Sequence, residues 1–330
     1  SGRRPAGARP HSLAPMDSPP AVRVAQAATP ALSLDGLCKA FGQKVAVNAL
    51  SLDVPTGSIY GMVGPNGAGK TTLIRIINHI TMPDSGEVTF DGHPLTQEDV
   101  SRIGYLPEER GLYRKMKVGE QAIYFAQLKG LSKADAKERL QYWFEKFDIM
   151  PWWNKKLEEL SKGMQQKVQF IITILHRPPL LIFDEPFSGF DPVNAELLKQ
   201  EILSLKREGH TIIFSTHNMS SVEEVCDNIA LINNANVVLS GNVHKIKEDN
   251  RTGLLKLCTT SGSLSERPDL FTIIDKEESH GLTRYSLKKQ TTVSNSELIR
   301  LFSDEVEIRS FQEQMPSMND IFLKIVGRHE

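Results

Sequence analysis

The sequence has few cysteines, no long apolar run and almost no net charge. Cys38, Cys226 and Cys258 lie far apart and form no CxxC pair, so we expect reduced thiols rather than disulfides or a thiolate metal site. No stretch approaches the roughly 18–20 apolar residues needed to span a bilayer, so we expect a soluble chain. With 40 acidic and 39 basic residues the formal charge is −1, which gives no electrostatic reason to expect nucleic-acid binding.

Residues 1–30 also have few acidic side chains and no hydrophobic period, and they are rich in Pro, Ala and Arg. This composition predicts a disordered N-terminal extension over residues 1–30. It is Arg-rich and acid-poor like an organellar transit peptide, but it lacks the 7–15-residue apolar core of a secretory signal. Because the chain begins at Ser1 and Met16 offers an internal start, we interpret the extension as a cloning remnant or upstream read-through.

What the sequence does contain is a glycine-rich stretch between a predicted strand and a predicted helix. The apolar run Ile59–Val63 predicts the strand, and Leu73–Ile77 predicts the helix. Glycine lets the backbone turn its N–H groups toward an anion, and the helix N-terminus adds its positive end. This is the context that a nucleotide phosphate loop requires. Its residues are Gly64, Pro65, Asn66, Gly67, Ala68, Gly69, Lys70, Thr71 and Thr72.

The loop and a pair of acids further along the chain predict a nucleoside-triphosphate site with Mg²⁺. Lys70 is placed to reach the β- and γ-phosphates, and the Thr71 hydroxyl is placed to bind Mg²⁺. A second apolar run, Leu180–Phe183, ends in Asp184 and Glu185, and ligands collect outside the carboxyl ends of such strands. We therefore predict that Asp184 holds Mg²⁺, directly or through water, and that Glu185 polarises the water that attacks the γ-phosphate.

Hydrophobic periodicity divides the rest of the chain into predicted domains. Alternating strands from Ala31, with a turn at Lys39–Gly42, give way to a helical block over about residues 115–177. Strands and helices then alternate to about residue 250, as in a parallel sheet. The predicted buried faces of the helical block are Val118, Ala122, Phe125 and Leu128, and Ala136, Leu140, Trp143 and Phe147.

Residues 251–330 predict a small α+β domain. It has several strand-like runs and two expected helices, at 296–302 and 319–326, and Ser317 and Asp320 have the spacing of a capping box before the second helix. The domain has no phosphate loop and no paired acids at a strand end. We therefore expect it to be dispensable for the chemistry and to act in regulation or dimer contact.

Further motifs occur in order around the strand acids. Residues 160–166, Leu-Ser-Lys-Gly-Met-Gln-Gln, lie upstream of them, residues 188–191, Ser-Gly-Phe-Asp, follow, and His217 comes after a strand predicted at 211–215. These motifs resemble the LSGGQ signature, the D-loop and the switch histidine of ATP-binding-cassette (ABC) ATPases, over roughly residues 31–250. The resemblance implies an α/β P-loop NTPase fold with a mixed sheet core, an antiparallel β subdomain and an inserted helical subdomain.

The resemblance also implies roles for individual residues. Phe41 matches the aromatic residue that stacks on adenine, and His217 matches the histidine that takes part in hydrolysis. Ser161 and Gly163 are expected to act in trans on ATP held by the opposite subunit, and Asp191 to lie along the dimer seam. Because a single cassette has only half of each composite site, the active form is expected to be a homodimer or heterodimer.

Three positions depart from the usual family pattern. The signature has Lys162 where Gly is usual and Met164 where Gln is usual. The Q-loop position is Glu108 instead of Gln. Glutamate is still an oxygen ligand for Mg²⁺ or its water, but an ionised carboxylate cannot donate a hydrogen bond.

Residues 108–113, Glu-Glu-Arg-Gly-Leu-Tyr, and 316–322, Pro-Ser-Met-Asn-Asp-Ile-Phe, narrow the resemblance to bacterial sodium-exporter and drug-exporter systems. That group implies an ATP-hydrolysing subunit on the inner face of the cell membrane, bound to a separate multi-spanning permease. The loop after Glu108, with Arg110 and Tyr113, is the predicted permease contact. The alternatives are a soluble ABC ATPase acting on ribosomes or DNA, which normally has two cassettes or a long coiled coil, and a nucleotide kinase, which would lack the signature.

Overall fold

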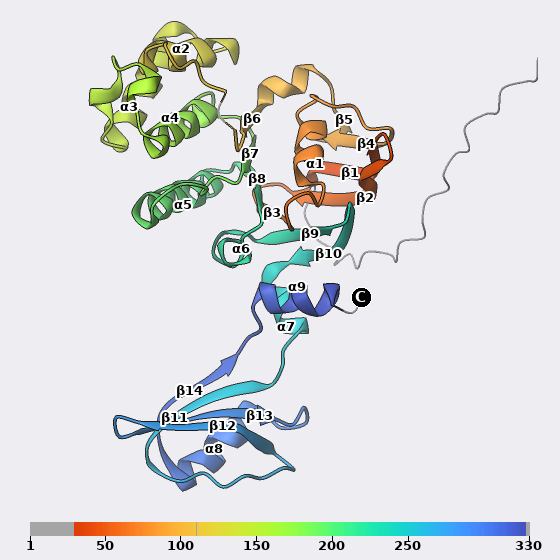
Figure 1. Cartoon of the computed structure of the whole chain (residues 1–330), viewed down its shortest axis with the longest axis vertical. Coiled ribbons are helices and arrows are strands. Elements are labelled where there is room, and N and C mark those ends of the chain that lie inside the picture. Colours follow the sequence, from red (N-terminus) through yellow and green to blue (C-terminus); the bar gives the residue numbers. More distant parts are fainter. Residues whose placement is uncertain (1–29, 110, 328–330) are drawn as a thin grey trace, which may run out of the picture. The chain divides into compact units, whose positions relative to one another are not determined.

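The computed structural model describes residues 30–109 and 111–327 (Figure 1). Most of the predicted N-terminal extension, and Arg110 of the predicted permease contact, lie outside the described residues. The described chain divides between Gly241 and Asn242 into two compact units. Each unit has its own hydrophobic core.

The first unit begins with an antiparallel sheet in the order β2-β1-β4-β5. Its strands are β1 (Pro30–Phe41), β2 (Lys44–Pro55), β4 (Ser85–Phe90) and β5 (His93–Pro94). The turn predicted at Lys39–Gly42 is wrong in its first part, because Lys39 to Phe41 continue β1 and Phe41 pairs with Lys44. Gly42, with a φ of 60°, is the residue that allows so tight a reversal.

A six-stranded sheet in the order β10-β9-β3-β8-β7-β6 forms the centre of this unit. Strands β3 and β6 to β9 pair in parallel, so the carboxyl ends of β3, β8 and β7 lie side by side at one edge. β10 returns from β9 through Asn234 and Ala235, which both have positive φ, as the tightest hairpins require. The bounds are β3 (Ile59–Val63), β6 (Ile103–Leu106), β7 (Leu180–Asp184), β8 (Thr211–Thr216), β9 (Asn228–Asn233) and β10 (Asn236–Asn242).

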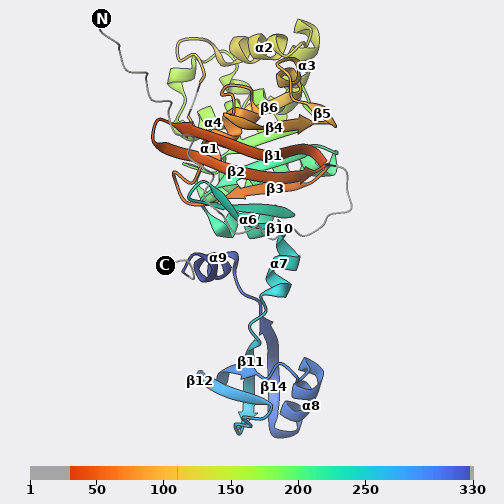
Figure 2. The same ribbon diagram turned by 90° about the vertical axis from the view of Figure 1, so that its right-hand side faces the viewer.

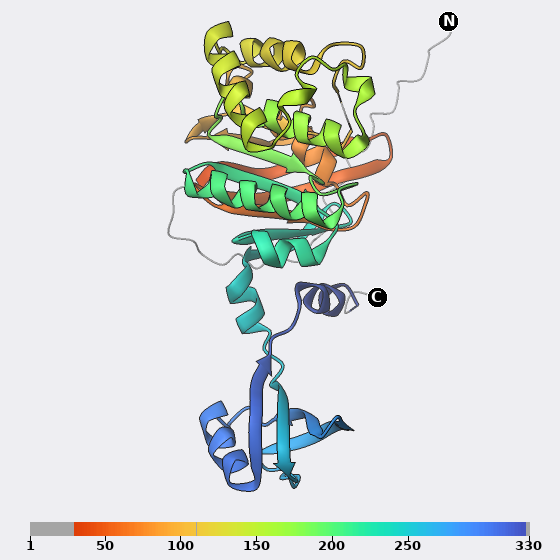
Figure 3. The same cartoon turned by 90° about the vertical axis from the view of Figure 1, so that its left-hand side faces the viewer.

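Helices cover both faces of the six-stranded sheet. Figure 1 shows α1 (Lys70–Ile77) and the antiparallel sheet on one side, and α5 (Pro192–Arg207) and α6 (Met219–Val225) on the other. Figure 3 shows α5 and α6 in front of the strands. The apolar residues of α1 belong to one core cluster with residues of both sheets. The phosphate loop is therefore held between a buried strand and a buried helix.

The helical block comprises α2 (Val118–Leu128), α3 (Lys133–Lys146) and α4 (Lys162–Ile174), with short 3₁₀ turns at Glu98–Arg102 before it and at Met150–Trp152 and Leu157–Glu159 within it. One predicted face of α2 is wrong at its end, because Leu128 is 62% exposed and Ala126 is buried instead. On α3, Phe144 is fully buried and packs edge-to-face on Trp153, whereas Trp143 is only half-buried. In α2, the period of 3.6 residues per turn rotates the buried face around the helix, so that Leu128 lies outside this face.

The second unit contains a four-stranded antiparallel sheet in the order β12-β13-β11-β14 (Figure 2). Phe302 of α8 and Phe271 of β12 meet edge-to-face in its core. The predicted capping box is confirmed, since Ser317 and Asp320 bond each other's backbone N–H groups. No helix among residues 30–109 and 111–327 is long and apolar enough to cross a membrane. The bounds are α7 (Val243–Asp249), β11 (Leu254–Gly262), β12 (Phe271–Ser279), β13 (Leu282–Lys289), α8 (Asn295–Glu305), β14 (Val306–Gln314) and α9 (Met318–Val326).

Candidate nucleotide site

An open cleft lies at the carboxyl edge of the six-stranded sheet. It brings together most of the phosphate loop with Phe41, Glu108, Asp184 and Glu185, although these residues are far apart in sequence. Lys44 also lines the cleft and was not predicted. The available signal was the β1–β2 hairpin, which places Lys44 directly opposite Phe41.

The glycines of the phosphate loop are required by close backbone contacts. A Cβ at Gly64 would lie 2.0 Å from the carbonyl oxygen of Ile232, and one at Gly69 would lie 2.4 Å from that of Ala46. Gly67 and Gly69 also have positive φ values of 81° and 116°, which side chains with a Cβ rarely adopt. The loop can therefore take this path, with α1 starting at Lys70, only with glycine at these positions.

Lys70 is buried at the centre of the loop. Its ammonium Nζ donates to the carbonyl oxygens of Gly64, at 2.6 Å, and Pro65, at 3.0 Å. Burial lowers the pKa of Lys70, and the nearby charges of Glu185 and Asp184 oppose that shift. A desolvated ammonium group near carboxylates can replace a hydrogen bond to a carbonyl oxygen with a stronger, charge-assisted hydrogen bond to a phosphate oxygen.

Asp184 ends strand β7 and is the most strongly perturbed acid in the cleft. Burial raises the pKa of its carboxyl to about 6, and the charges of Glu108 and Glu185 act in the same direction. The ionised form is therefore disfavoured unless a cation is near, which is the state expected of a carboxylate that binds a metal ion.

We predict that Asp184→Asn stabilises the metal- and nucleotide-free protein at pH 8. The pKa of about 6 lies above the ordinary 3.8, so the ionised carboxylate costs stability above about pH 6, and this cost is absent below about pH 4. The difference corresponds to at most roughly 3 kcal/mol. Urea unfolding with EDTA should show the variant ahead at pH 8 and the two proteins converging as the pH falls to 4.5. Asp269→Asn, at an exposed site, is the control. Equal stability of Asp184→Asn and wild type at pH 8 would contradict the raised pKa of the Asp184 carboxyl.

Glu185 is held in one orientation by β8 and the residue after it. Its Oε1 accepts hydrogen bonds from the backbone N–H of His217, at 2.8 Å, and from Nδ1 of the His217 ring, at 2.6 Å. Its Oε2 accepts from the Thr216 hydroxyl at 3.2 Å. Because a carboxylate only accepts, the Nδ1 of His217 carries a proton and leaves Nε2 free to act. The positive φ of Glu185, 48°, is the strained turn that places this side chain in the cleft.

The oxygen donors in the cleft fit Mg²⁺ bound together with a nucleotide. Thr71, Glu108 and Asp184 all line it, and hydroxyl and carboxylate oxygens are the ligands Mg²⁺ prefers. Among residues 30–109 and 111–327, no group of three His, Cys, Asp or Glu side chains is arranged to hold a metal. Mg²⁺ bound with a nucleotide usually completes its coordination shell with phosphate oxygens and water.

Phe41 provides an aromatic surface at the mouth of the cleft. It is 53% exposed, and the ammonium of Lys39 lies 5.4 Å from its ring centroid. An exposed ring at the end of a hairpin gains from being covered by a flat partner, and stacking on a base is typically worth about 1–3 kcal/mol. Its position suits the base of a nucleotide whose phosphates lie on the loop.

The signature and D-loop residues do not line the cleft. Ser161 caps α4, accepting a hydrogen bond from the Met164 N–H at 3.3 Å. Asp191 caps α5 through the N–H groups of Val193 and Asn194, both at 3.0 Å, and these hydrogen bonds lower the pKa of Asp191. Gln166 of α4 donates to the carbonyl oxygen of Ser188, which ties the signature helix to the D-loop within the chain.

Comparison with known proteins divides the chain at nearly the same place as the two structural units. A sequence profile described as ABC transporter matches residues 47–188, and one described as the C-terminal domain of DrrA1-3-like ATP-binding proteins matches residues 241–326. The uncharacterized ABC transporter ATP-binding protein YhaQ of Bacillus subtilis (strain 168) is 42% identical over 298 residues, which are 90% of this chain and 98% of YhaQ. The Nod factor export ATP-binding protein I of Rhizobium sp. (strain N33) is 30% identical over 307 residues, 90% of this chain and 97% of that protein.

A solved structure described as the ATP-binding subunit of an ABC transporter has a TM-score of 0.62 and 29% identity, covering 66% of this chain and 92% of its own. The chain belongs to the ABC transporter family of ATP-binding proteins, which hydrolyse ATP. The predicted family resemblance and α/β cassette fold are confirmed. The cleft is the candidate ATP site of this chain.

Proposed function

We propose that this protein is the ATP-hydrolysing subunit of an ABC exporter, and that it drives a separate membrane permease through ATP-dependent closure of a dimer. The observation that carries the proposal is the arrangement at the cleft. Glu185 is fixed by His217 and Thr216 at the end of β7, beside the phosphate loop. The proposed pair of Glu185 as general base and His217 as its partner suits attack of water on a γ-phosphate.

We propose a dimer because two residues expected to contact the phosphates do not line the cleft. Ser161 and Gly163 do not line it, although a helix N-terminus with a serine hydroxyl suits a phosphate. A Cβ at Gly163 would meet no described atom within 4 Å, so packing within the described chain does not require glycine there. We propose that these residues close over ATP held by a second subunit, with Asp191 along the seam and Mg²⁺ held by Thr71, Asp184 and Glu108.

The exporter assignment rests on the relatives and on the C-terminal domain. One relative is named for Nod factor export, and the profile of residues 241–326 is described from DrrA1-3-like ATP-binding proteins. We propose that the subunit sits on the inner face of the cell membrane through its permease, and that residues 251–330 act outside the chemistry. We propose that the permease determines which substrate is transported. Co-purification from native membranes identifies this permease, which is the first step toward the substrate.

The proposed permease contact is the loop that follows Glu108. Tyr113 is 55% exposed and stacks on Phe125 with ring centroids 5.9 Å apart. The buried Gln121 side chain accepts from the Tyr113 N–H at 3.2 Å and donates to the carbonyl oxygens of Tyr113 and Met116, both at 3.3 Å. The loop is thus fixed on α2 while its aromatic ring stays open to a partner, and aromatic residues are enriched in interfaces.

We predict that Tyr113→Ala keeps the ATPase activity of the isolated subunit within about twofold but reduces recovery of the subunit with the permease by at least tenfold. Loss of a buried aromatic anchor typically costs about 2 kcal/mol or more of binding energy. Tyr142→Ala, on α3, is the matched control because Tyr142 is also exposed, at 57%. Equal recovery of both variants in affinity purification from membranes would place the permease contact elsewhere. Arg110→Glu tests the same loop.

A further inference from the structure

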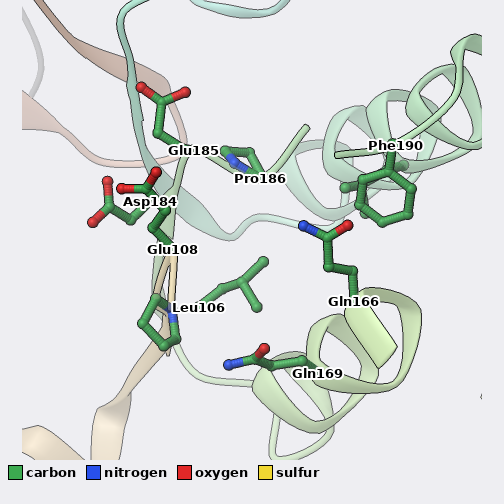
Figure 4. A pocket seen from close by; sticks show the side chains of 10 residues that line it. Leu106, Glu108, Gln166, Gln169, Asp184, Glu185, Pro186 and Phe190 are labelled. Atoms are coloured by element: carbon green, nitrogen blue, oxygen red, sulfur yellow. The ribbon is translucent and has the colours of Figure 1, made fainter. Parts of the chain in front are cut away.

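The acids of the ATP site line two cavities. Glu108, Asp184 and Glu185 line the cleft and also a second cavity beside it (Figure 4). Gln166 and Gln169 of α4 line the second cavity from the other side. Both cavities therefore belong to the site already described. A charged surface that no step of the proposed ATP chemistry uses lies on the helical block.

That surface is a short two-stranded ribbon of residues 113–117 and 152–156, called here the basic ribbon. Its two segments run antiparallel, with Lys117 opposite Lys156. The residue after each of these lysines donates its N–H to the carbonyl oxygen of the residue before the other, at 2.9 and 3.2 Å. Trp153 packs edge-to-face on a buried ring of α3. The basic ribbon is therefore held firmly on the helical block.

The basic ribbon carries five cations and no acidic residue, and all five charged side chains are exposed. They are Arg114, Lys115, Lys117, Lys155 and Lys156. Among the described residues, only Lys117 of these five forms an ion pair, with Glu120 at 3.9 Å. Glu158 and Glu159 follow the ribbon in sequence, and the Glu159 carboxylate accepts from the backbone N–H of Lys156 at 2.6 Å. Because the whole chain has a formal charge of −1, the ribbon is a local concentration of positive charge.

The placement of these cations is unfavourable without an anionic partner. Like charges directly opposite each other in an antiparallel pair destabilise it, and Lys117 and Lys156 are such a pair. Further cations adjoin both lysines along the chain, which adds to the repulsion. A surface that only faces water gains nothing from holding these charges together, whereas a negatively charged partner is attracted by all of them.

A lipid surface fits the basic ribbon better than a single anion does. Five long side chains on an exposed ribbon do not enclose one phosphate group, but each can meet a different headgroup. Aromatic and apolar groups accompany the charges, since Tyr113 is 55% exposed, Met150 is 37% exposed and Trp152 is partly exposed. Trp and Tyr are enriched where proteins meet the membrane–water interface, and clusters of Lys and Arg bind anionic lipids.

We propose that the basic ribbon binds anionic lipid headgroups of the bilayer around the permease. The ribbon begins at Tyr113, the proposed permease contact, so a subunit docked there brings the neighbouring cations to the membrane surface. The lipids then add affinity and help to orient the subunit on its permease. This inference deepens the proposed function and rests on it for the location at the membrane.

Sedimentation of the purified full chain with lipid vesicles tests the proposal without permease or ATP. At about 0.05 M salt, wild type should bind phosphatidylcholine vesicles with about one-third phosphatidylglycerol at least about tenfold more tightly than vesicles of phosphatidylcholine alone. Raising the salt to about 0.5 M should remove most of this difference, because ions screen exposed charges.

A pair of double variants assigns the binding to the ribbon. Lys155→Gln combined with Lys156→Gln should weaken binding to the anionic vesicles about 10–30-fold, since each cation near such a surface contributes to affinity. Lys133→Gln combined with Lys137→Gln is the matched control. It removes two exposed lysines of α3 and changes the net charge equally, and it should change binding less than about twofold because these lysines lie outside the ribbon.

Equal vesicle binding by the two double variants would overturn the proposal, as would equal binding of wild type to both kinds of vesicle. Recovery with the permease in detergent distinguishes a protein partner. If the ribbon variant binds anionic vesicles as wild type does but loses the permease, the ribbon contacts an acidic protein surface and the lipid proposal is wrong. Failure of the proposed function would look different, because wild type would then recover no permease while vesicle sedimentation would still report on the ribbon.

Discussion

Replacing Glu185 with glutamine is expected to lower ATP turnover by about 10²–10⁴-fold and to leave ATP binding in place. Glutamine has the same shape, and its carbonyl oxygen can still accept from the backbone N–H of His217, as Glu185 Oε1 does at 2.8 Å. The amide cannot accept the proton of the attacking water, however. The loss therefore falls on the chemical step rather than on affinity.

The measurement is steady-state ATPase activity beside equilibrium ATP binding by fluorescence. Because ATP is bound but not cleaved, the variant should also accumulate as an ATP-dependent dimer in gel filtration. Glu109→Gln is the matched control, since Glu109 follows Glu108 but lines neither cavity. Hydrolysis by Glu185→Gln within about tenfold of wild type would remove Glu185 from the role of general base.

The parts of the site that follow from local sequence were predictable. The phosphate loop requires glycine because of its local backbone conformation, as the positive φ values of Gly67 and Gly69 show. Asp184 and Glu185 end an apolar run, and the carboxyl ends of parallel strands meet at one edge whatever their order along the sheet. Strand β8 in fact lies between β3 and β7, and the cleft nevertheless joins their ends.

Residues that enter the site through long-range packing were not predictable. Thr216 reaches Glu185 only because β8 pairs with β7, so that Asp184 lies opposite Ser215. Gln169 faces the strand ends only because α4 packs near β6. A glutamine inside an amphipathic helix gives no sign of which cavity it will face, since periodicity identifies a buried stripe but not its partner.

Hydrophobic periodicity also gave a wrong prediction of burial where an apolar residue lies on the surface. Leu128 fits a helical repeat with Val118 and Ala122, yet it is exposed while the polar Gln121 is fully buried. Gln121 is buried because its amide satisfies the backbone of the loop at Tyr113 and Met116. In the sequence, a buried glutamine that bonds backbone groups looks the same as a glutamine exposed to solvent. Hydrophobic patterning therefore assigns it to the exposed face.

Replacing Lys70 with alanine is expected to weaken ATP binding by about 10–200-fold, because a hydrogen bond to a charged group is worth roughly 1.5–3 kcal/mol. Lys70 is 7% exposed and lies among Asp184, Glu185 and Glu108. Removing its ammonium leaves these acids facing a triphosphate of the same sign. The effect on binding thus combines a lost donor with repulsion that the lysine had offset.

The loss should appear in equilibrium binding, before any turnover, which separates this variant from Glu185→Gln. Lys44→Ala is the matched control, since Lys44 lines the same cleft but is exposed, and its removal should weaken binding less than about fivefold because water screens its charge. The Lys70 contacts to Gly64 and Pro65 also hold the loop, so thermal unfolding must first show that the variant is folded. A folded Lys70→Ala protein that binds ATP as tightly as wild type would mean that the triphosphate does not lie on this loop.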